Sequence, residues 1–484
     1  MTDLNKVLLN VLKNITPTTQ ELSLIEDINQ KLINILSKTA QKLNIKYTKI
    51  EPQGSTGIKQ TQLRNNFDID LFIGLDYELY KHKYKGLSKS KLKKESKKDF
   101  LKLCNNWIIK SLSPKEFHNP RLLFAEHPYV TVDYIIDKLI IKVDIVLYFD
   151  LDLDYIKKFG PITAVDRSPW HGRFIRENLT LAQKDDVRLI KQFFKASNCY
   201  GDKSAVGKVG FIGYSAELLI FYYKNIKNLL MHFNELKDKP LDFYVREPKD
   251  LEKIVHFQQD YLIIVDPIDK NRNVASSISK KAYKYIDFKI QEFLNDPRED
   301  FFEIKEIPLI NLKDINKNIL FKIFIIELTN LEPNIHYTIN RDKLYSLAES
   351  IKTKGEKEYS HHDRFKSIEY EIYFEENSGE YNIAFYCETP KISNTYIRRG
   401  PPISEKRHSK KFKLKNPSFF EKDNYLWVET NRDYHSFLDF LTDMISNNLP
   451  DNFEVTNISQ ANNVKTKSAK RTLFILLNLV LPFI

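Results

Sequence analysis

The chain has 484 residues, of which 42% are hydrophobic and 13% aromatic, a composition that excludes disorder throughout. This length exceeds what one ordinary core needs, so we expect two to four domains. The net charge of +11 favours a polyanion partner such as RNA, DNA or an anionic membrane. A cytosolic protein from an AT-rich genome, whose codons favour Lys, Ile and Asn, would carry a similar excess.

The N-terminal half shows helix and strand patterns in alternation. Apolar residues recur at helical spacing over residues 4–49. Two strand patterns, over 67–75 and 130–149, enclose a lysine-rich helical stretch over 88–112. Two further helices are predicted at 185–197 and 214–230.

The C-terminal half changes to short apolar runs typical of strands, such as ILFKIFIIEL, YEIYFEE and NIAFYCE. Two charged stretches, 354–367 and 404–416, are expected in loops or at rims. The chain ends in TLFILLNLVLPFI, residues 472–484, which is too short to span a bilayer that needs roughly 20 apolar residues. This end is interpreted as a buried terminal helix, an interfacial anchor, or sequence foreign to the ancestral domain.

The cysteines and the N-terminus bear on the cellular compartment. Cys104, Cys199 and Cys387 are odd in number, far apart and without metal-ligand spacing, which indicates a reducing compartment and no disulfide framework. MTDLNKVLLNVLKN begins like an amphipathic helix and lacks the apolar core of a signal peptide. We therefore expect a cytoplasmic protein with no stable membrane association.

Two aspartates stand one residue apart in GSTGIKQTQLRNNFDIDLFIGL, residues 54–75. Because side chains alternate along a strand, Asp68 and Asp70 point to one side while Ile69, Leu71 and Ile73 point into the core. Two carboxylates at this spacing can bind a hard divalent cation such as Mg²⁺. A solvated strand surface is the commoner outcome for this pattern alone.

A third aspartate, Asp144, interrupts the otherwise apolar strand pattern KLIIKVDIVLYF. A lone Asp in a buried strand is costly unless it is paired or binds a metal. If the two strands are neighbours, the three aspartates form a cluster that can hold two Mg²⁺ ions for nucleotidyl transfer. Upstream, Gly54 and Ser55 would place backbone N–H groups and a hydroxyl against a triphosphate.

The pattern GS-x(12)-D-x-D with a later buried Asp resembles the polymerase-β-like nucleotidyltransferase superfamily. Beyond it, the chain resembles the archaeal (class I) CCA-adding tRNA nucleotidyltransferases over about residues 20–460. The matching stretches are AEHPYV, KVDIVLYF, AVDRSPWHGRF, DDVRLIKQFFKASNCYG, GFIGYSAELLI, VDPIDKNRNVASSIS and RRGPPI. Seven stretches in one order make the resemblance specific.

The resemblance implies a role for each matching residue. Asp68, Asp70 and Asp144 match the catalytic metal carboxylates, and Gly54 and Ser55 match the triphosphate contact. Other matches belong to the nucleotide pocket: His171, Lys191, Tyr200, and Arg272, which matches an arginine that helps to select C and A. Lys191 as a solvated helix lysine and Tyr200 as a packing residue remain the alternatives from the residues alone.

This chain departs from the family pattern in the loop GSTGIKQTQL, which is one residue longer than usual. Direct counting places Ile58 where the family has a basic residue. A shifted loop would place Lys59 at that phosphate contact, and we expect Lys59 to be the nucleotide-binding residue. The hydrophobic end after residue 470 also has no counterpart in the family pattern.

The resemblance implies a function and a fold. The function is template-independent addition of C, C and A to the 3′ end of tRNA from CTP and ATP, using two Mg²⁺ ions. The fold is a multidomain α+β architecture: a nucleotidyltransferase head with a mixed sheet flanked by helices, a helical neck, and an α+β body and tail. We place these parts at 1–150, 151–280 and 281–467, followed by an extension over 468–484.

Partners follow from the same resemblance. The C-terminal half should contact the acceptor stem and elbow of tRNA by shape and phosphate contacts, with Arg398, Arg399 and the lysines from Lys406 to Lys415 as candidates. Family members are often dimers, so a homodimer is open. Two alternatives also stay open: a related poly(A)- or oligonucleotide-synthesising nucleotidyltransferase, and a catalytically inactive RNA-binding relative.

Overall fold

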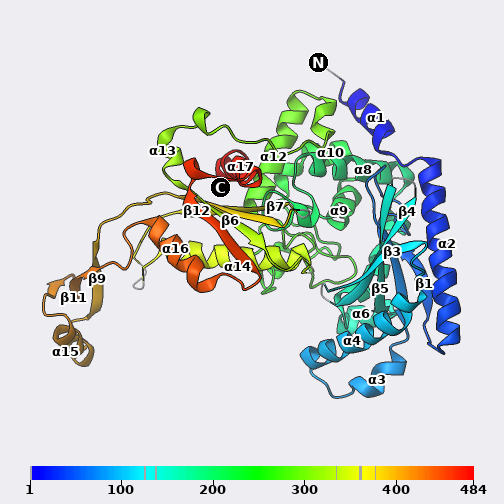
Figure 1. The fold of residues 1–484 in the computed structure, drawn as a ribbon, viewed down its shortest axis with the longest axis horizontal. Coiled ribbons are helices and arrows are strands. Elements are labelled where there is room, and N and C mark those ends of the chain that lie inside the picture. Colours follow the sequence, from blue (N-terminus) through cyan, green and yellow to red (C-terminus); the bar gives the residue numbers. More distant parts are fainter. Residues whose placement is uncertain (1–2, 125–126, 137–138, 334, 359–361, 376–377) are drawn as a thin grey trace. The chain divides into compact units, whose positions relative to one another are not determined.

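The computed structural model describes residues 3–124, 127–136, 139–333, 335–358, 362–375 and 378–484. The chain separates into two compact units. Unit 1 holds residues 1–204 and 209–305, and unit 2 holds residues 205–208 and 306–484 (Figure 1). The predicted division into head, neck, body and extension stays a prediction beside these two units.

Unit 1 contains a five-stranded mixed sheet in the order β1-β2-β5-β4-β3. Within it, β2 and β5 run parallel and the other neighbouring pairs run antiparallel. The strands are β1 (Lys49–Gln53), β2 (Ile69–Leu75), β3 (Phe117–Phe124), β4 (Pro128–Ile136) and β5 (Leu139–Phe149). The predicted strands at 67–75 and 130–149 are thus confirmed, except that residues 137 and 138 lie outside the described residues.

Helices cover one side of this sheet and form its core. Ile69, Leu71 and Ile73 of β2 are fully buried and belong to the same hydrophobic cluster as Leu32 of α2 and Phe100 of α4. The prediction that Ile69, Leu71 and Ile73 point into the core is confirmed. Because side chains alternate along a strand, the opposite side of β2 remains for its aspartates.

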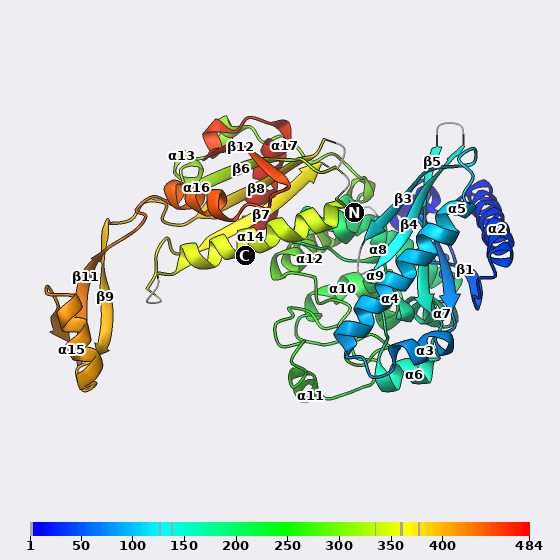
Figure 2. The same cartoon turned by 60° about the horizontal axis from the view of Figure 1, so that its bottom comes forward.

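The remaining helices of unit 1 form a second layer in which α8 packs against α1 and α9, and α10 against α12 (Figure 2). The predicted helices at 88–112, 185–197 and 214–230 are present, the last as two helices, whereas the helical prediction over 4–49 holds only to Lys42, because β1 begins at Lys49. The helices of unit 1 are α1 (Leu4–Ile15), α2 (Thr19–Lys42), α3 (Glu78–Tyr84), α4 (Lys89–Leu103), α5 (Ile109–Ser111), α6 (Leu153–Phe159), α7 (Ser168–Asn178), α8 (Leu181–Ala196), α9 (Gly213–Tyr223), α10 (Ile226–Met231), α11 (Pro248–Glu252) and α12 (Lys280–Asn295).

Unit 2 is built on a four-stranded antiparallel sheet in the order β12-β6-β8-β7. Apolar residues of α14 and α16, such as Leu344 and Leu441, pack on one side of it. The helices of unit 2 are α13 (Lys317–Leu320), α14 (Tyr337–Glu356), α15 (Lys406–Lys415), α16 (Phe437–Asn448) and α17 (Lys467–Phe474). Its strands are β6 (Ile323–Asn330), β7 (Ile368–Glu375), β8 (Glu380–Cys387), β9 (Thr395–Pro402), β10 (Phe420–Lys422), β11 (Tyr425–Asn431) and β12 (Phe453–Gln460).

The hydrophobic C-terminus is a buried terminal helix, one of the three interpretations of the sequence. Ile383 of β8 faces the core with α14 and α16, so its neighbour Asn382 points to the other side of the sheet. There Asn382 donates a 2.7 Å hydrogen bond to Ser468 of α17. Leu473 and Leu476 are fully buried, so the tail covers this second side. Within the described ranges, none of the helices combines the length and apolar character that crossing a bilayer requires.

A smaller sheet, ordered β10-β11-β9, projects with α15 from the rest of unit 2 (Figure 2). Residues 404–416 were predicted to lie in a loop or at a rim, and the loop alternative is wrong, because α15 spans 406–415. The aromatic ring of Phe412 lies against Gly400 of β9, which gives this lysine-rich segment an apolar contact. In the other charged stretch, 354–367, α14 continues to Glu356, and residues 359–361 lie outside the described residues.

Candidate active site

Asp70 and Asp144 are direct register partners on the parallel strands β2 and β5. The prediction that these strands are neighbours is therefore confirmed. On its other side Asp70 pairs with Gln53, the last residue of β1, so the chain turns at Gly54 beside the carboxylate. Gly54 has a φ of +65°, and a Cβ at this position would lie 2.0 Å from Asp70 Oδ2. Only glycine fits between this turn and the carboxylate.

The charges around Asp70 and Asp144 are incompletely compensated. Lys142 Nζ lies 3.0 Å from Asp144 Oδ2, whereas Asp144 Oδ1 is buried with no hydrogen-bond partner among the described residues. Burial, with added repulsion from Asp144 and Asp68, raises the pKa of Asp70 to about 7. Desolvation by the surrounding protein also raises the pKa of Asp68, which stands just before β2.

Oxygen donors of this kind fit a hard divalent cation. Two observations support such a cation: the unpaired buried oxygen of Asp144 and the raised pKa of the neighbouring Asp70. Across the described residues, however, no three His, Cys, Asp or Glu side chains lie close enough together to hold one ion. The role of Asp68, Asp70 and Asp144 as metal ligands stays a prediction.

The loop over residues 54–63 is fixed to the sheet and to α8. Thr56 Oγ1 donates a 3.0 Å hydrogen bond to the carbonyl of Asp68, and the backbone N–H of Thr61 donates to the carbonyl of Ser55. From α8, Arg188 donates to the carbonyls of Gln60 and Gln62, at 2.7 and 3.0 Å. These contacts hold Ser55 between the aspartates and the helical layer.

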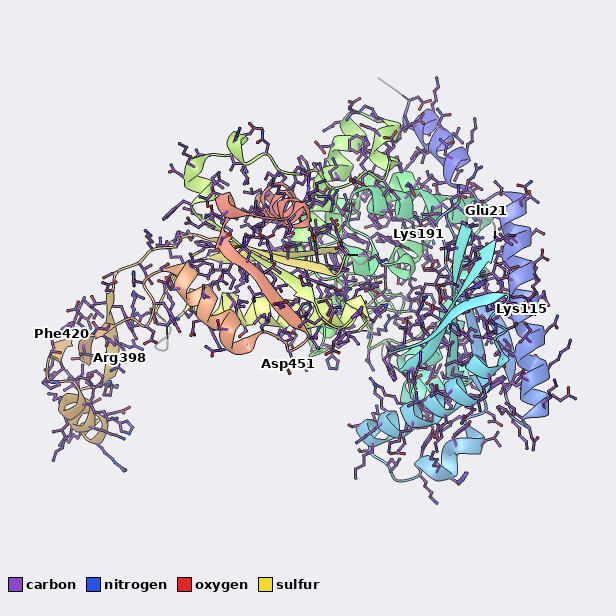
Figure 3. The ribbon with its side chains drawn as sticks, viewed as in Figure 1. Glu21, Lys115, Lys191, Arg398, Phe420 and Asp451 are labelled. Atoms are coloured by element: carbon purple, nitrogen blue, oxygen red, sulfur yellow. The ribbon has the colours of Figure 1, made fainter. Side chains whose placement is uncertain are left out.

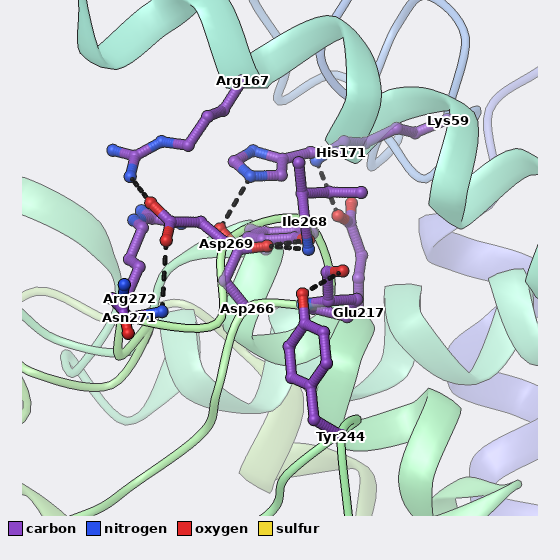
Figure 4. A network of polar contacts seen from close by, with 12 residues as sticks. Lys59, Arg167, His171, Glu217, Tyr244, Asp266, Ile268, Asp269, Asn271 and Arg272 are labelled. Carbon is purple, nitrogen blue, oxygen red and sulfur yellow. Dashed lines mark hydrogen bonds and ion pairs between the residues drawn. The ribbon is translucent and has the colours of Figure 1, made fainter. Parts of the chain in front are cut away.

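Lys59 and Lys191 converge on one buried acid, Glu217 of α9, and Figure 4 shows Lys59 beside it. Lys59 Nζ lies 2.7 Å from Glu217 Oε2, and Lys191 Nζ lies 3.0 Å from Oε1. Thr61 Oγ1 donates to Oε1 as well and accepts from Lys191. Although burial acts to raise the pKa of Glu217, Lys191 and Lys59 hold it at about 2.

The structure also places Ile58 and Tyr200 around this group. The side chain of Ile58 packs against α7 instead, where its Cγ2 lies 2.4 Å from the position that a Cβ on Gly172 would take. Lys59, and not Ile58, therefore shares the partner Glu217 with Lys191. The hydroxyl of Tyr200 and the Nζ of Lys191 both lie near Gly213, at 3.1 and 3.5 Å from an added Cβ.

His171 and Arg272 share a second buried acid, Asp266 (Figure 4). His171 Nε2 and Arg272 Nη1 each lie 2.8 Å from Asp266 Oδ2, while the Tyr214 hydroxyl and the Ile268 N–H donate to Oδ1. Burial lowers the pKa of His171, and the charge of Asp266 opposes this change. Burial acts to raise the pKa of Asp266, but its basic partners outweigh burial and lower it.

Glu217 and Asp266 were missed in the sequence, although both lie in the stretches that carry the family resemblance. The sequence pattern could have indicated Glu217, because this acid interrupts the apolar helix SAELLIFYY in the same way as Asp144 interrupts its strand. Each acid is fully or almost fully buried, so each requires charged partners. The pairing of particular lysines with Glu217 depends on the fold and leaves no trace in the sequence pattern.

Arg398 and Arg399 lie in unit 2, on β9, in the part that carries α15 (Figure 3). Arg398 lies over the ring of Phe412, with its guanidinium carbon 5.5 Å from the centroid, and Arg399 lies 4.6 Å over Tyr425. Arg399 is exposed and Arg398 is half-buried. The two side chains point to opposite sides of the strand, so they do not form one contact point.

The chain is similar to known proteins of one enzyme family. The family described as tRNA nucleotidyltransferase, second domain, matches residues 185–303, and CCA-adding enzyme, C-terminal domain, matches residues 336–451. The chain is 28% identical to the CCA-adding enzyme of Methanocaldococcus jannaschii over 92% of both chains. It is 31% identical to that of Thermoplasma volcanium over 68% of this chain and 64% of that one.

A solved structure of the Cid1 poly(U) polymerase aligns with 62% of this chain and 98% of its own, at 13% identity and a TM-score of 0.44, too weak to support an argument. The sequence matches and the mixed sheet with its paired aspartates define the chain as a nucleotidyltransferase. It belongs to the archaeal-type CCA-adding enzymes.

Proposed function

We propose that this protein adds C, C and A to the 3′ end of tRNA from CTP and ATP without a nucleic-acid template. The observation that carries the chemistry is the pairing of Asp70 with Asp144 across β2 and β5, next to the glycine turn at Gly54. The relatives named CCA-adding enzymes, which span almost the whole chain, support the choice of product.

The reaction joins the 3′ oxygen of the tRNA to the α-phosphorus of the nucleotide, and pyrophosphate leaves. Two Mg²⁺ ions, when bound to Asp68, Asp70 and Asp144, would supply Lewis-acid stabilisation of the charge that develops on the phosphate. The protein's own contribution is to position both substrates and exclude competing geometries. No covalent intermediate with the protein is needed.

The nucleotide is assigned to the groups beside these aspartates. Gly54 and Ser55 would contact the triphosphate through backbone N–H groups and a hydroxyl. The ammonium groups of Lys59 and Lys191 would bind its charge, and the ring and hydroxyl of Tyr200 would border it. His171 and Arg272, both oriented by Asp266, would line the pocket for the base.

The tRNA is assigned to both units. The 3′ end must reach Asp70, whereas the acceptor stem and elbow are assigned to unit 2, with Arg398 and Arg399 as phosphate contacts. The exposed guanidinium group of Arg399 suits a phosphate backbone, because its planar N–H groups recognise phosphate oxygens in a fixed geometry. Whether a second copy of the chain takes part is answered by measuring the mass of the enzyme in solution.

Incubation with Mg²⁺ and labelled tRNA that ends at its discriminator base tests the proposal. CTP alone should extend the tRNA by two residues, CTP and ATP together by three, and Asp70→Ala should abolish both. Long homopolymer tails would instead indicate a poly(A)- or oligonucleotide-synthesising relative. Binding of tRNA without any addition by intact protein would indicate an inactive RNA-binding relative.

A further inference from the structure

Glu217, which was not among the predicted site residues, lies at the centre of a buried group of charges that includes Lys59 and Lys191. Glu217 is 1% exposed. Its carboxylate accepts hydrogen bonds from Lys59 and Thr61 of the loop after β1 and from Lys191 of α8. These partners come from two elements other than its own helix, so the acid joins the loop, α8 and α9. One carboxylate thereby fixes two ammonium groups that are separate in the chain.

The charge balance of this group is unequal. Two ammonium ions face a single carboxylate, so one positive charge remains uncompensated within the group. Both lysines repel each other, and burial removes the water that would otherwise solvate them. A buried cluster with a surplus positive charge, next to the turn at Gly54, suits a polyphosphate anion.

We propose that Glu217 is a positioning residue that holds the ammonium groups of Lys59 and Lys191 side by side for the phosphates of the incoming nucleotide. The inference rests on the proposed function for the identity of that nucleotide. Its physical basis is that removing the carboxylate would leave two adjacent buried cations, which release a proton more readily. Burial already lowers the pKa of Lys191, and Glu217 opposes that change.

Other charged or titratable groups surround this cluster and contribute to the electrostatic potential at the two lysines. Lys59 Nζ also lies 4.9 Å over the ring of Tyr214, whose hydroxyl binds Asp266. Arg188 stands one helical turn before Lys191 and binds the loop carbonyls. The remaining neighbours are Lys184 and Lys195 of α8, Tyr200, and His171. Among the acids of this neighbourhood, Glu217 is the one that contacts both Lys59 and Lys191.

Glu217→Gln tests the inference, with CTP and Mg²⁺ as the probe and the dissociation constant as the readout. In this variant the affinity for CTP should fall about tenfold at pH 7, the effect of one weakened charge-assisted contact. It should fall further towards pH 9, because a lysine without its carboxylate loses its proton earlier. Glu217→Asp retains the charge and should restore a shallow pH dependence.

Two results from folded Glu217→Gln protein would overturn the inference. Unchanged affinity at both pH values would show that the carboxylate serves the fold alone. Tighter binding would show that Glu217 competes with the phosphates for the lysines. Glu235→Gln, which removes an exposed acid paired with Lys239, is the matched control and should bind CTP like the wild type.

A second variant keeps the test decisive if Glu217→Gln does not fold. Lys59→Met removes one cation from the loop, where the side chain is 12% exposed, and leaves Lys191 with its carboxylate. Its affinity for CTP should fall about tenfold and equally at pH 7 and pH 9; unchanged affinity would refute the inference. Wild-type protein that binds CTP but adds no nucleotide would refute the proposed function and leave this inference standing.

Discussion

Asp70 and Asp144 face each other as register partners on two parallel strands, with a buried carboxylate oxygen of Asp144 left without a partner among the described residues. The pair weakens the fold, because the Asp144 carboxylate adds to the effect of burial in disfavouring the ionised form of Asp70. We infer that the arrangement is retained for catalysis, and several consequences can be measured.

Asp70→Asn should abolish nucleotide addition and stabilise the metal-free protein. The folded pKa of about 7 exceeds the unfolded value of 3.8, so ionised Asp70 costs stability increasingly as pH rises between them. At pH 8 the variant should gain about 1–3 kcal/mol in the free energy of unfolding, and less at pH 5. Urea denaturation in EDTA measures this, with the exposed Asp152→Asn as control. A variant less stable than wild type at pH 8 would contradict the account.

Added Mg²⁺ should raise the melting temperature of the wild type more at pH 8 than at pH 6. The carboxylates must be deprotonated to bind a cation, and Asp70 gives up its proton near pH 7. Asp144→Asn should remove most of the effect, because it removes the negative charge and replaces one of the two carboxylate oxygens by an NH2 group. Differential scanning fluorimetry with and without the ion gives the answer. An equal shift at both pH values, kept in the variant, would place the ion elsewhere.

Gly54→Ala should cost activity at least a hundredfold and stability by about 1–3 kcal/mol, because its Cβ would collide with Asp70 and its φ disfavours an L side chain. Gly86 offers a matched control, since it also has positive φ but no atom within 4 Å of an added Cβ. Gly86→Ala should therefore lose about 1 kcal/mol from strain and keep its activity. Single-turnover rates and thermal denaturation should be measured for both variants. Gly86→Ala reports the backbone strain alone, and the additional loss in Gly54→Ala reports the collision with Asp70.

Asp266→Asn should weaken the discrimination between CTP and UTP, because His171 and Arg272 lose the charged oxygen that orients them. We expect the ratio of kcat/KM values for the two nucleotides to fall about tenfold. A substitution that damages only the fold would reduce both values together and leave the ratio unchanged. Asp250→Asn, which removes an exposed acid paired with Lys253, is the control.

Arg399→Gln should raise KM for tRNA and leave KM for CTP unchanged. The exposed guanidinium, if it contacts a phosphate, contributes one ionic contact, so the dependence of tRNA affinity on log salt should become shallower by about one. Binding titrations at several salt concentrations measure the slope. An unchanged slope would show that Arg399 serves only its contact with Tyr425.

The sequence predicted most of the helices and strands, and it placed Asp70 and Asp144 together once their strands were taken as neighbours. Such patterns depend on local periodicity and on the cost of an acid in an apolar run. It did not predict Glu217 or Asp266 as centres of charge, because their partners are distant in the chain. It also did not predict the helix α15, which it placed in a loop or at a rim, since the apolar contact of Phe412 with Gly400 is likewise long-range.

The most direct test of the central claim is to sequence the 3′ ends of tRNA after incubation with the purified protein and all four nucleotides together. The account predicts that C, C and A are added in that order, that addition then stops, and that Asp144→Asn adds nothing. Products that incorporate U or G freely, or that continue past the first A, would contradict it.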